Sequence, residues 1–275
     1  MTSKPIQIQQ SSVQEWPEWQ FLDATTELLA TLTTAVRSAP SSNYGLLYPF
    51  LDSIEESTGT LRVLAERLML RDSYVIARVI YETAINACFL LTDPTRLSER
   101  ASLHAKQKTL RNLVRKIEIA GTPLFEYKQS NADELMQEPE HKKLLDEFTS
   151  KSGREITSWT PENVQQRLEA VYLQFGAEAT KGLAFGLLMY RHASEIAHGT
   201  LYGTLFSWGA VEPNRPLQSP DDLSEFRRAE LRHLLKLVCF SLESLIRVAG
   251  PVVGATGLAD AAKKAFLAYY EAKDA

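Results

Sequence analysis

Apolar residues recur at intervals of three and four along most of this 275-residue sequence, and the strict apolar/polar alternation of a half-buried β-strand is scarce. Spacing of three and four places apolar side chains on one face of an α-helix. The clearest example runs from Ser73 to Leu91 and stops before Pro94, since proline disfavours helical backbone in the residue that precedes it. The sequence therefore predicts an all-α fold.

The helices can be placed from this periodicity and from the turn residues between them. We expect them at residues 17–38, 43–70, 73–91, 96–120, 131–150, 161–176, 178–202 and 222–249, followed by a short C-terminal helix. The intervening loops with linker composition, near 121–130, 151–160 and 208–221, are each too short to separate two independent cores. We predict a single-domain helical bundle over 17–250, with a polar arm at 1–16 and a peripheral C-terminal helix at 251–275 packed on the bundle.

Charge and cysteine content narrow the classes of protein. The formal net charge is −4 and the isoelectric point is about 5.8, so RNA or another polyanion would need a local basic patch. The first residues lack the layout of a signal peptide, and no uninterrupted run reaches the roughly 18 apolar residues of a membrane span. Cys88 and Cys239 lie in apolar helical runs, where a thiol acts as a small hydrophobe. We expect a cytoplasmic protein without membrane association.

A narrow polar stripe crosses the most apolar predicted helix. Arg78, Glu82 and Asn86 are spaced four apart and therefore line one side of it. Arg78 and Glu82 can pair along the helix, and a partly buried charge must be paired because an isolated one is very unfavourable. The stripe is thus either an internal ion pair that fixes helix packing or one part of a functional site.

A second polar cluster, YRHASEIAHG at residues 190–199, lies between two apolar segments. On a helix, several of its side chains share an arc of about 100°, whereas His192 points to one side. The residues that share the arc are Arg191, Ser194, Glu195 and His198. Because the apolar seam continues beside them, we predict that this arc faces inward, towards the stripe on the earlier helix.

The cluster resembles the Arg-x4-6-His signature of the HEPN superfamily (higher eukaryotes and prokaryotes nucleotide-binding), with Arg191 and His198 as its two residues. The wider pattern, Arg-x-x-x-Glu followed by Tyr-x-x-x-Ser-x-x-x-His, is similar to an uncharacterised bacterial all-helical family over residues 45–205. The first resemblance implies an HEPN-like bundle. Many HEPN-like proteins are metal-independent ribonucleases that assemble their site across a homodimer, and others have no activity.

The resemblance gives the polar residues roles in RNA cleavage without a metal or a cofactor. His198 would move a proton near neutral pH, and Arg191 would hold the phosphate oxygens. Glu195 or Glu82 would orient the imidazole, and Arg78 would add a second cation. The supporting residues would be Asn86, Tyr190 and Ser194.

RNA would also need a basic surface, and the predicted helix at 96–120 supplies a candidate. Lys108, Arg111 and Arg115 lie on one side of it, opposite an apolar side. The stripe could contact phosphates without regard to base sequence. The alternative is the ordinary solvated face of an amphipathic helix.

Two other functions remain open. Glu195-x-x-His198 and Glu230-x-x-His233, with Glu82 and Glu66 as single ligands, match the ligand set of a di-iron carboxylate bundle. A non-catalytic module is the other alternative, in which a buried Arg/Glu/His network fixes helix packing and the outer surface binds a partner protein. Phosphate-loop and Gly-x-Ser-x-Gly signatures are absent from the sequence, so nucleotide-dependent and serine-hydrolase functions have no support.

Overall fold

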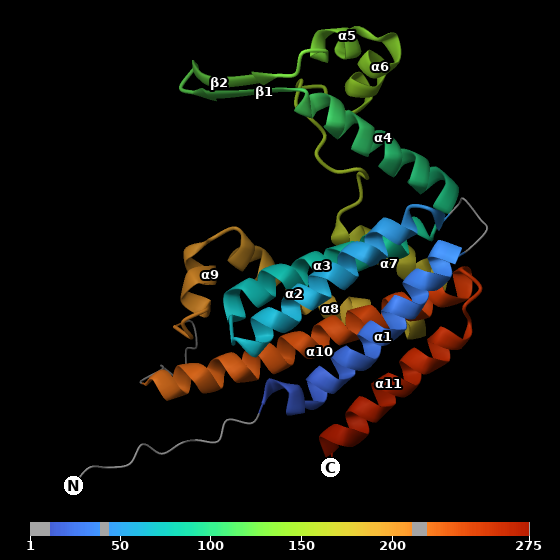
Figure 1. The fold of residues 1–275 in the computed structure, drawn as a ribbon, viewed down its shortest axis with the longest axis vertical. Helices are drawn as coiled ribbons and strands as arrows, with labels where there is room; N and C mark the ends of the chain where they lie inside the picture. The colour runs from blue at the N-terminus through green and yellow to red at the C-terminus, as the bar shows by residue number, and fades with distance from the viewer. Residues whose placement is uncertain (1–11, 39–43, 211–218, 275) are drawn as a thin grey trace. The chain divides into compact units, whose positions relative to one another are not determined.

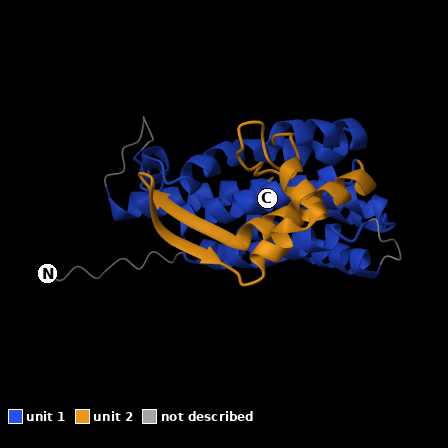
Figure 2. Ribbon diagram, turned by 90° about the horizontal axis from the view of Figure 1, so that it is seen from above, with its two compact units in different colours: residues 1–92, 164–275 blue, residues 93–163 orange. Residues whose placement is uncertain are grey.

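The computed structural model describes residues 12–38, 44–210 and 219–274. The chain divides into two compact units, which Figure 2 separates by colour: a helical unit of residues 1–92 and 164–275, and an inserted unit of residues 93–163. The predicted all-α fold is confirmed, because the regular structure of the described residues is helical apart from a two-stranded sheet and one isolated β-bridge.

Eight α-helices make up most of the described part of the helical unit (Figure 1). They are α1 Pro17–Ser38, α2 Leu47–Glu66, α3 Leu70–Leu90, α7 Val164–Phe175, α8 Ala177–Ala197, α9 Leu201–Phe206, α10 Pro220–Val252 and α11 Gly257–Asp274. The start of α10 shows how local sequence sets a boundary: the Ser219 hydroxyl accepts a hydrogen bond from the backbone N–H of Asp222 at 3.1 Å, and proline occupies the first turn. Most of the predicted polar arm at 1–16 lies outside the described residues, and its described end includes buried Val13 and Trp16.

The core of this unit forms where α3, α8 and α10 pack together. Two glycines of α8 permit the close approach: a Cβ at Gly182 would lie 1.9 Å from the backbone oxygen of Phe240, and one at Gly186 would lie 2.1 Å from the Tyr81 ring. The Tyr81 hydroxyl donates a hydrogen bond to the backbone oxygen of Leu183 at 2.8 Å. In the described part of the chain, no helix combines the length and the apolar character needed to cross a membrane.

A buried carboxylate ties the outer helices α1 and α11 to α10. Glu18 on α1 is 5% exposed and accepts a hydrogen bond from Arg232 Nε at 2.9 Å and another from the Tyr269 hydroxyl at 3.3 Å. Burial, with Glu18 beside it, raises the pKa of Tyr269. Cys88 and Cys239 are both buried free thiols whose pKa is raised by burial, as expected for small hydrophobes in a core.

The inserted unit contains α4 Pro94–Asn112, β1 Val114–Ile119, β2 Thr122–Lys128, α5 Ala132–Gln137 and α6 Pro139–Glu147. It has a small core of its own, made by Leu110, Leu113, Ala132, Leu144 and Phe148. The prediction of one bundle over 17–250 is therefore corrected. The loops are short, as predicted, but the helices and the hairpin of residues 93–163 pack around this separate core and form a second unit.

The predicted helix at 96–120 is wrong at its C-terminal end. It stops at Asn112, and a β-hairpin follows in which Ile119 pairs with Thr122. The two turn residues, Ala120 and Gly121, have φ of 50° and 78°, as a two-residue hairpin turn requires. The flanking segments VRKIEI and TPLFEYK carried the β-branched and aromatic residues typical of strands, so the signal was present in the sequence.

Candidate functional site

The YRHASEIAHG cluster forms the end of α8 rather than the middle of a helix reaching residue 202. His198 is the C-terminal cap of α8, and Gly199 follows with φ of 64°, a left-handed conformation that glycine adopts readily. Thr200 then caps α9, its hydroxyl accepting a hydrogen bond from the Gly203 backbone N–H at 3.1 Å. The chain therefore turns directly after His198.

The predicted inward arc is wrong, because Arg191, Glu195 and His198 are exposed. Ser194 is half-buried and its hydroxyl donates to the backbone oxygen of Tyr190 at 2.8 Å. The buried face of α8 is instead made by Thr180, Gly182, Leu183, Gly186, Met189, Ala193 and Ile196. The small residues on this face set the helix phase, since the neighbouring helices approach most closely there.

Arg78 of the polar stripe on α3 contacts α8. Arg78 lies over the Tyr190 ring, 5.3 Å from its centroid, and its Nε is 3.8 Å from Glu82 Oε2. Asn86 turns elsewhere: its Oδ1 accepts a hydrogen bond from Nη1 of buried Arg167 on α7 at 2.5 Å. The structure thus brings Arg78, Glu82 and Tyr190 together, whereas Asn86 contributes to the packing of α3 on α7.

No hydrogen bond or ion pair is formed by the side chains of Arg191, Glu195 or His198 with any other described residue. The expected orientation of the His198 imidazole by Glu195 or Glu82 is therefore not seen. The buried Arg/Glu/His network of the non-catalytic alternative is not seen either, because these three side chains face solvent. The exposed face at the end of α8 is open to a ligand.

His192, set aside in the sequence as the outlying residue, lies in an aromatic cluster. Its ring centroid is 4.0 Å from that of Phe206 and 5.4 Å from that of Tyr74, and its Nδ1 shares a hydrogen bond with the Tyr202 hydroxyl at 3.1 Å. The Tyr74 hydroxyl donates to Glu230 Oε2 at 3.0 Å. With His233 and nearby apolar side chains, these residues line a groove of about 330 Å³, which we call the His192 groove.

Burial shifts the pKa of three side chains that line the His192 groove, namely His192, His233 and Tyr74. It lowers the pKa of His192, with Glu230 acting in the opposite direction, and it lowers the pKa of His233 together with Lys236. Burial and Glu230 raise the pKa of Tyr74. Both imidazoles therefore favour the neutral form at neutral pH. Sequence reasoning missed Tyr74, Tyr202 and Phe206. The spacing of four between Tyr202 and Phe206 was a usable signal for a shared helix face, whereas Tyr74 comes from α3 and reaches His192 only through tertiary packing.

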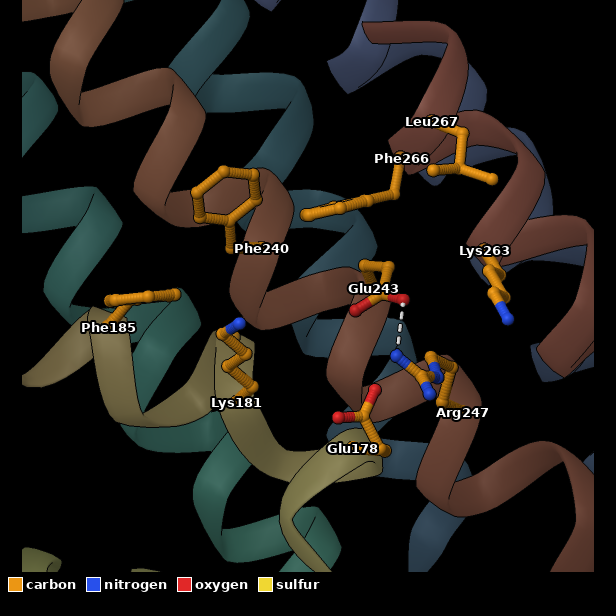
Figure 3. A pocket seen from close by; sticks show the side chains of 10 residues that line it. Glu178, Lys181, Phe185, Phe240, Glu243, Arg247, Lys263, Phe266 and Leu267 are labelled. Atoms are coloured by element: carbon orange, nitrogen blue, oxygen red, sulfur yellow. Dashed lines mark hydrogen bonds and ion pairs between the residues drawn. The ribbon is translucent and has the colours of Figure 1, made fainter. Parts of the chain in front are cut away.

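A smaller pocket of about 130 Å³ lies among α8, α10 and α11 (Figure 3). The close-up shows the rings of Phe240 and Phe266 on one side and the ion pair of Glu243 with Arg247, 3.2 Å apart, on the other. Burial raises the pKa of Glu243, and Arg247 opposes that rise. Arg247 neutralises the buried Glu243 carboxylate within one helix, so the pair has a structural role in α10.

The predicted basic stripe is largely engaged within the inserted unit. Lys108 pairs with Glu155, and Arg115 Nε donates to Asn112 Oδ1 at 2.9 Å. Arg111 Nη2 donates to the backbone oxygen of Leu145 at 3.0 Å and to the Thr149 hydroxyl at 2.7 Å. These contacts hold α4 to its neighbours, so the stripe is not a free phosphate-binding surface.

The four glutamates of the di-iron alternative do not meet. Glu66 accepts a hydrogen bond from Gln14, Glu82 pairs with Arg78, and Glu230 accepts one from Tyr74. Over the described residues, no three side chains of histidine, cysteine, aspartate or glutamate gather closely enough to share a metal ion. The ligand set inferred from the Glu-x-x-His spacing is therefore not assembled.

Comparison with known proteins matches part of the sequence to a family. No curated protein and no solved structure matches the chain. Residues 46–212, more than half of the sequence, match a family of unknown function, DUF5677. The matched region runs from the start of α2 to beyond α9 and so includes Arg78, Glu82 and the whole end of α8. The chain belongs to the DUF5677 family.

Proposed function

We propose that this protein is a metal-independent endoribonuclease of HEPN type, acting on RNA in the cytoplasm in defence or stress. The observation that carries the proposal is that Arg191 and His198 are both exposed and unpaired among the described residues. Seven residues span two helical turns, so the two side chains leave one face of α8 about 10 Å apart along its axis. A phosphodiester can reach both groups from solvent, and the long arginine side chain can span the separation.

The chemistry follows from these two groups. His198 accepts the proton of a ribose 2′-hydroxyl, and the 2′-oxygen attacks the adjacent phosphorus. The bond from phosphorus to the 5′-oxygen breaks, and that oxygen takes a proton from the imidazolium, which regenerates the neutral imidazole. Arg191 donates hydrogen bonds to the non-bridging oxygens as their negative charge increases. The products carry a 2′,3′-cyclic phosphate and a 5′-hydroxyl, and no step needs a metal ion.

The neighbouring polar residues have positioning roles in this proposal. Glu82 and the Tyr190 ring hold Arg78 between them, so Arg78 can supply a second cation to the RNA backbone. Glu195 is free to orient the imidazole once RNA is bound. Ser194 is engaged with the backbone of its own helix, and Asn86 joins α3 to α7, so both have structural roles in this proposal rather than roles in the reaction.

Cleavage of a single-stranded RNA in EDTA tests the proposal. The wild type is compared with His198→Ala and Arg191→Ala, and Lys181→Ala, an exposed cation on the same helix, is the matched control. We expect cleavage by the wild type and the control, loss of cleavage in the other two, and a cyclic phosphate end by mass spectrometry. No cleavage by the wild type, or undiminished cleavage by His198→Ala, would overturn it.

Exposed apolar side chains favour a second candidate function, a non-catalytic interaction module. Leu188 on α8, Leu201 on α9 and Trp208 just after α9 are 67%, 74% and 70% exposed. Such a concentration of exposed apolar residues suits contact with another protein surface, including a second copy of this chain. Sedimentation velocity of the wild type and of a Leu201→Asp, Trp208→Asp variant tests it: a dimer that the variant dissociates supports the module, and a monomeric wild type argues against self-association.

A further inference from the structure

Three arginines that form no ion pair with a described residue line a pocket at one end of the helical unit. The pocket has a volume of about 250 Å³ and lies among the α2–α3 turn, the end of α9 and the start of α10. Figure 1 shows these segments gathered at the same end of the unit. Arg67 and Arg71 come from the two sides of the turn, Arg227 comes from α10, and Ser207 closes the wall from the end of α9. We call it the arginine pocket.

The charge of the arginine pocket favours an anion. Among the described residues that line it, Asp72 is the single carboxylate, against three guanidinium groups. Within the described residues, no ion pair joins Arg67, Arg71 or Arg227 to any carboxylate. Three like charges around one concavity repel one another, and a bound anion would relieve that repulsion. The arginines of the pocket are therefore available, unlike the engaged cations of the inserted unit.

Phosphate is the anion that this arrangement fits best. A guanidinium group presents parallel N–H donors that match two oxygens of a phosphate, and several arginines can hold different oxygens of one group. The backbone of the turn is fixed, since the N–H of Leu68 donates to Ala65 at 3.0 Å and that of Met69 donates to Leu64 at 2.9 Å. Arg67 and Arg71 are thus held on either side of the pocket.

The arginine pocket is connected to the end of α8 through the aromatic cluster. Ser207 directly follows Phe206, whose ring packs on His192, the neighbour of Arg191. Tyr74 packs against the same two rings and lies one helical turn after Arg71 on α3. The pocket and the exposed face of α8 therefore belong to the same end of the helical unit.

We propose that the arginine pocket binds a phosphate group. The phosphate could come from a free anion such as pyrophosphate or from the backbone of a bound RNA. The second source rests on the proposed ribonuclease function, in which the pocket would hold a part of the strand away from Arg191 and His198.

Binding measurements on the full chain test this proposal. Pyrophosphate binding is measured by calorimetry, and binding of a fluorescent single-stranded RNA is measured by anisotropy in a His198→Ala background that prevents cleavage. The pocket variant carries Arg67→Gln, Arg71→Gln and Arg227→Gln. Its matched control carries Lys181→Gln, Lys263→Gln and Lys264→Gln, three exposed cations of the helical unit outside the arginine pocket, so both variants lose the same charge.

We expect the pocket variant to bind at least one probe about 10-fold or more weakly, and the control to change far less, because only the pocket arginines converge on one group. Weakened pyrophosphate binding identifies a free anion as a ligand, and weakened RNA binding identifies the RNA backbone. For RNA, the slope of log affinity against log salt should become shallower by about 0.7 in the pocket variant, because the pocket neutralises one phosphate of a single strand. Thermal melts of both variants verify folding. Arg71→Lys keeps the charge but loses the parallel N–H donors of the guanidinium group, so it should give an intermediate loss of affinity.

The proposal is overturned if the wild type binds neither probe, or if the pocket variant and the control lose affinity equally. Its failure is separable from that of the ribonuclease. A wild type that binds pyrophosphate through the pocket but cleaves no RNA keeps the phosphate site and removes the nuclease. If the wild type cleaves RNA and the pocket variant binds both probes as its control does, the ribonuclease function is kept and the phosphate site is removed.

Discussion

Two histidines six residues apart at the end of α8 have opposite surroundings. His192 is half-buried against Phe206 and Tyr74, shares a hydrogen bond with Tyr202, and has a lowered pKa. His198 is exposed at the helix cap without a partner among the described residues. The difference follows from which side of α8 faces its neighbours. A dense polar segment therefore divides into one group that packs and one group that remains free for a ligand.

The largest effect that we expect from this comparison is on catalysis by the exposed histidine. Replacing His198 with alanine should lower the rate of RNA cleavage by about 10²–10⁴-fold, because the proton carrier is lost. The free energy of unfolding should change by less than about 0.5 kcal/mol, since an exposed side chain without partners is removed. Initial cleavage rates and urea unfolding check the two parts. A large loss of stability would show that His198 is structural.

Arg191 should show a slightly smaller effect. Arg191→Lys keeps the positive charge but removes the planar pair of donors, and cleavage should fall by about 10–100-fold. The matched change is Lys181→Arg on the same helix, which should leave the rate unaltered. Single-turnover rates in EDTA measure both, and an unaltered rate in Arg191→Lys would mean that the guanidinium fork does not contact the phosphate.

His192 should instead affect stability. His192→Ala removes ring contacts to Phe206, Tyr74 and Tyr202, and we expect a loss of about 1.5 kcal/mol in the free energy of unfolding. RNA cleavage should be retained at temperatures where the variant is folded. Urea unfolding followed by circular dichroism provides the measurement. Loss of cleavage with unchanged stability would indicate that the reaction takes place in the His192 groove.

The smallest expected effect is on pH dependence. Because the pKa of His192 is lowered in the folded state, the unfolded chain takes up the proton first as the pH falls below about 6.5. Stability is therefore fully present above that pH and decreases below it. His192→Phe, which keeps a ring in the cluster, should reduce the decrease in melting temperature between neutral and mildly acidic pH. Part of it should remain, since the pKa values of His104 and His233 are lowered too. An equal decrease in variant and wild type would contradict this assignment.

The sequence predicted those features of the fold that local patterns determine. The all-α fold and the long apolar helix before Pro94 were predicted correctly, and Asp93 caps the next helix by accepting a hydrogen bond from the Arg96 backbone N–H. The hairpin at 114–128 was missed because apolar spacing was interpreted as helix up to residue 120 and residues 121–130 were interpreted as a loop, although the Ala120-Gly121 turn joins two paired strands.

The orientation of α8 could not be predicted from its large apolar residues alone. Leu188 of α8 is exposed, whereas Gly182, Gly186 and Ala193 belong to the buried face of the same helix. Glycine leaves no mark on a hydrophobic pattern, yet it decides where two helices approach most closely. The partner of Asn86, Arg167, was equally beyond local reasoning, because 81 residues separate them and only tertiary packing brings them together.

The most direct test of this account compares His198→Gln with His192→Phe in a single RNA-cleavage assay in EDTA, with melting curves recorded on the same samples. We predict that His198→Gln melts like the wild type and has lost cleavage, and that His192→Phe cleaves at a rate close to that of the wild type. Retained cleavage in His198→Gln together with lost cleavage in folded His192→Phe would contradict the assignment of the exposed histidine as the reacting group.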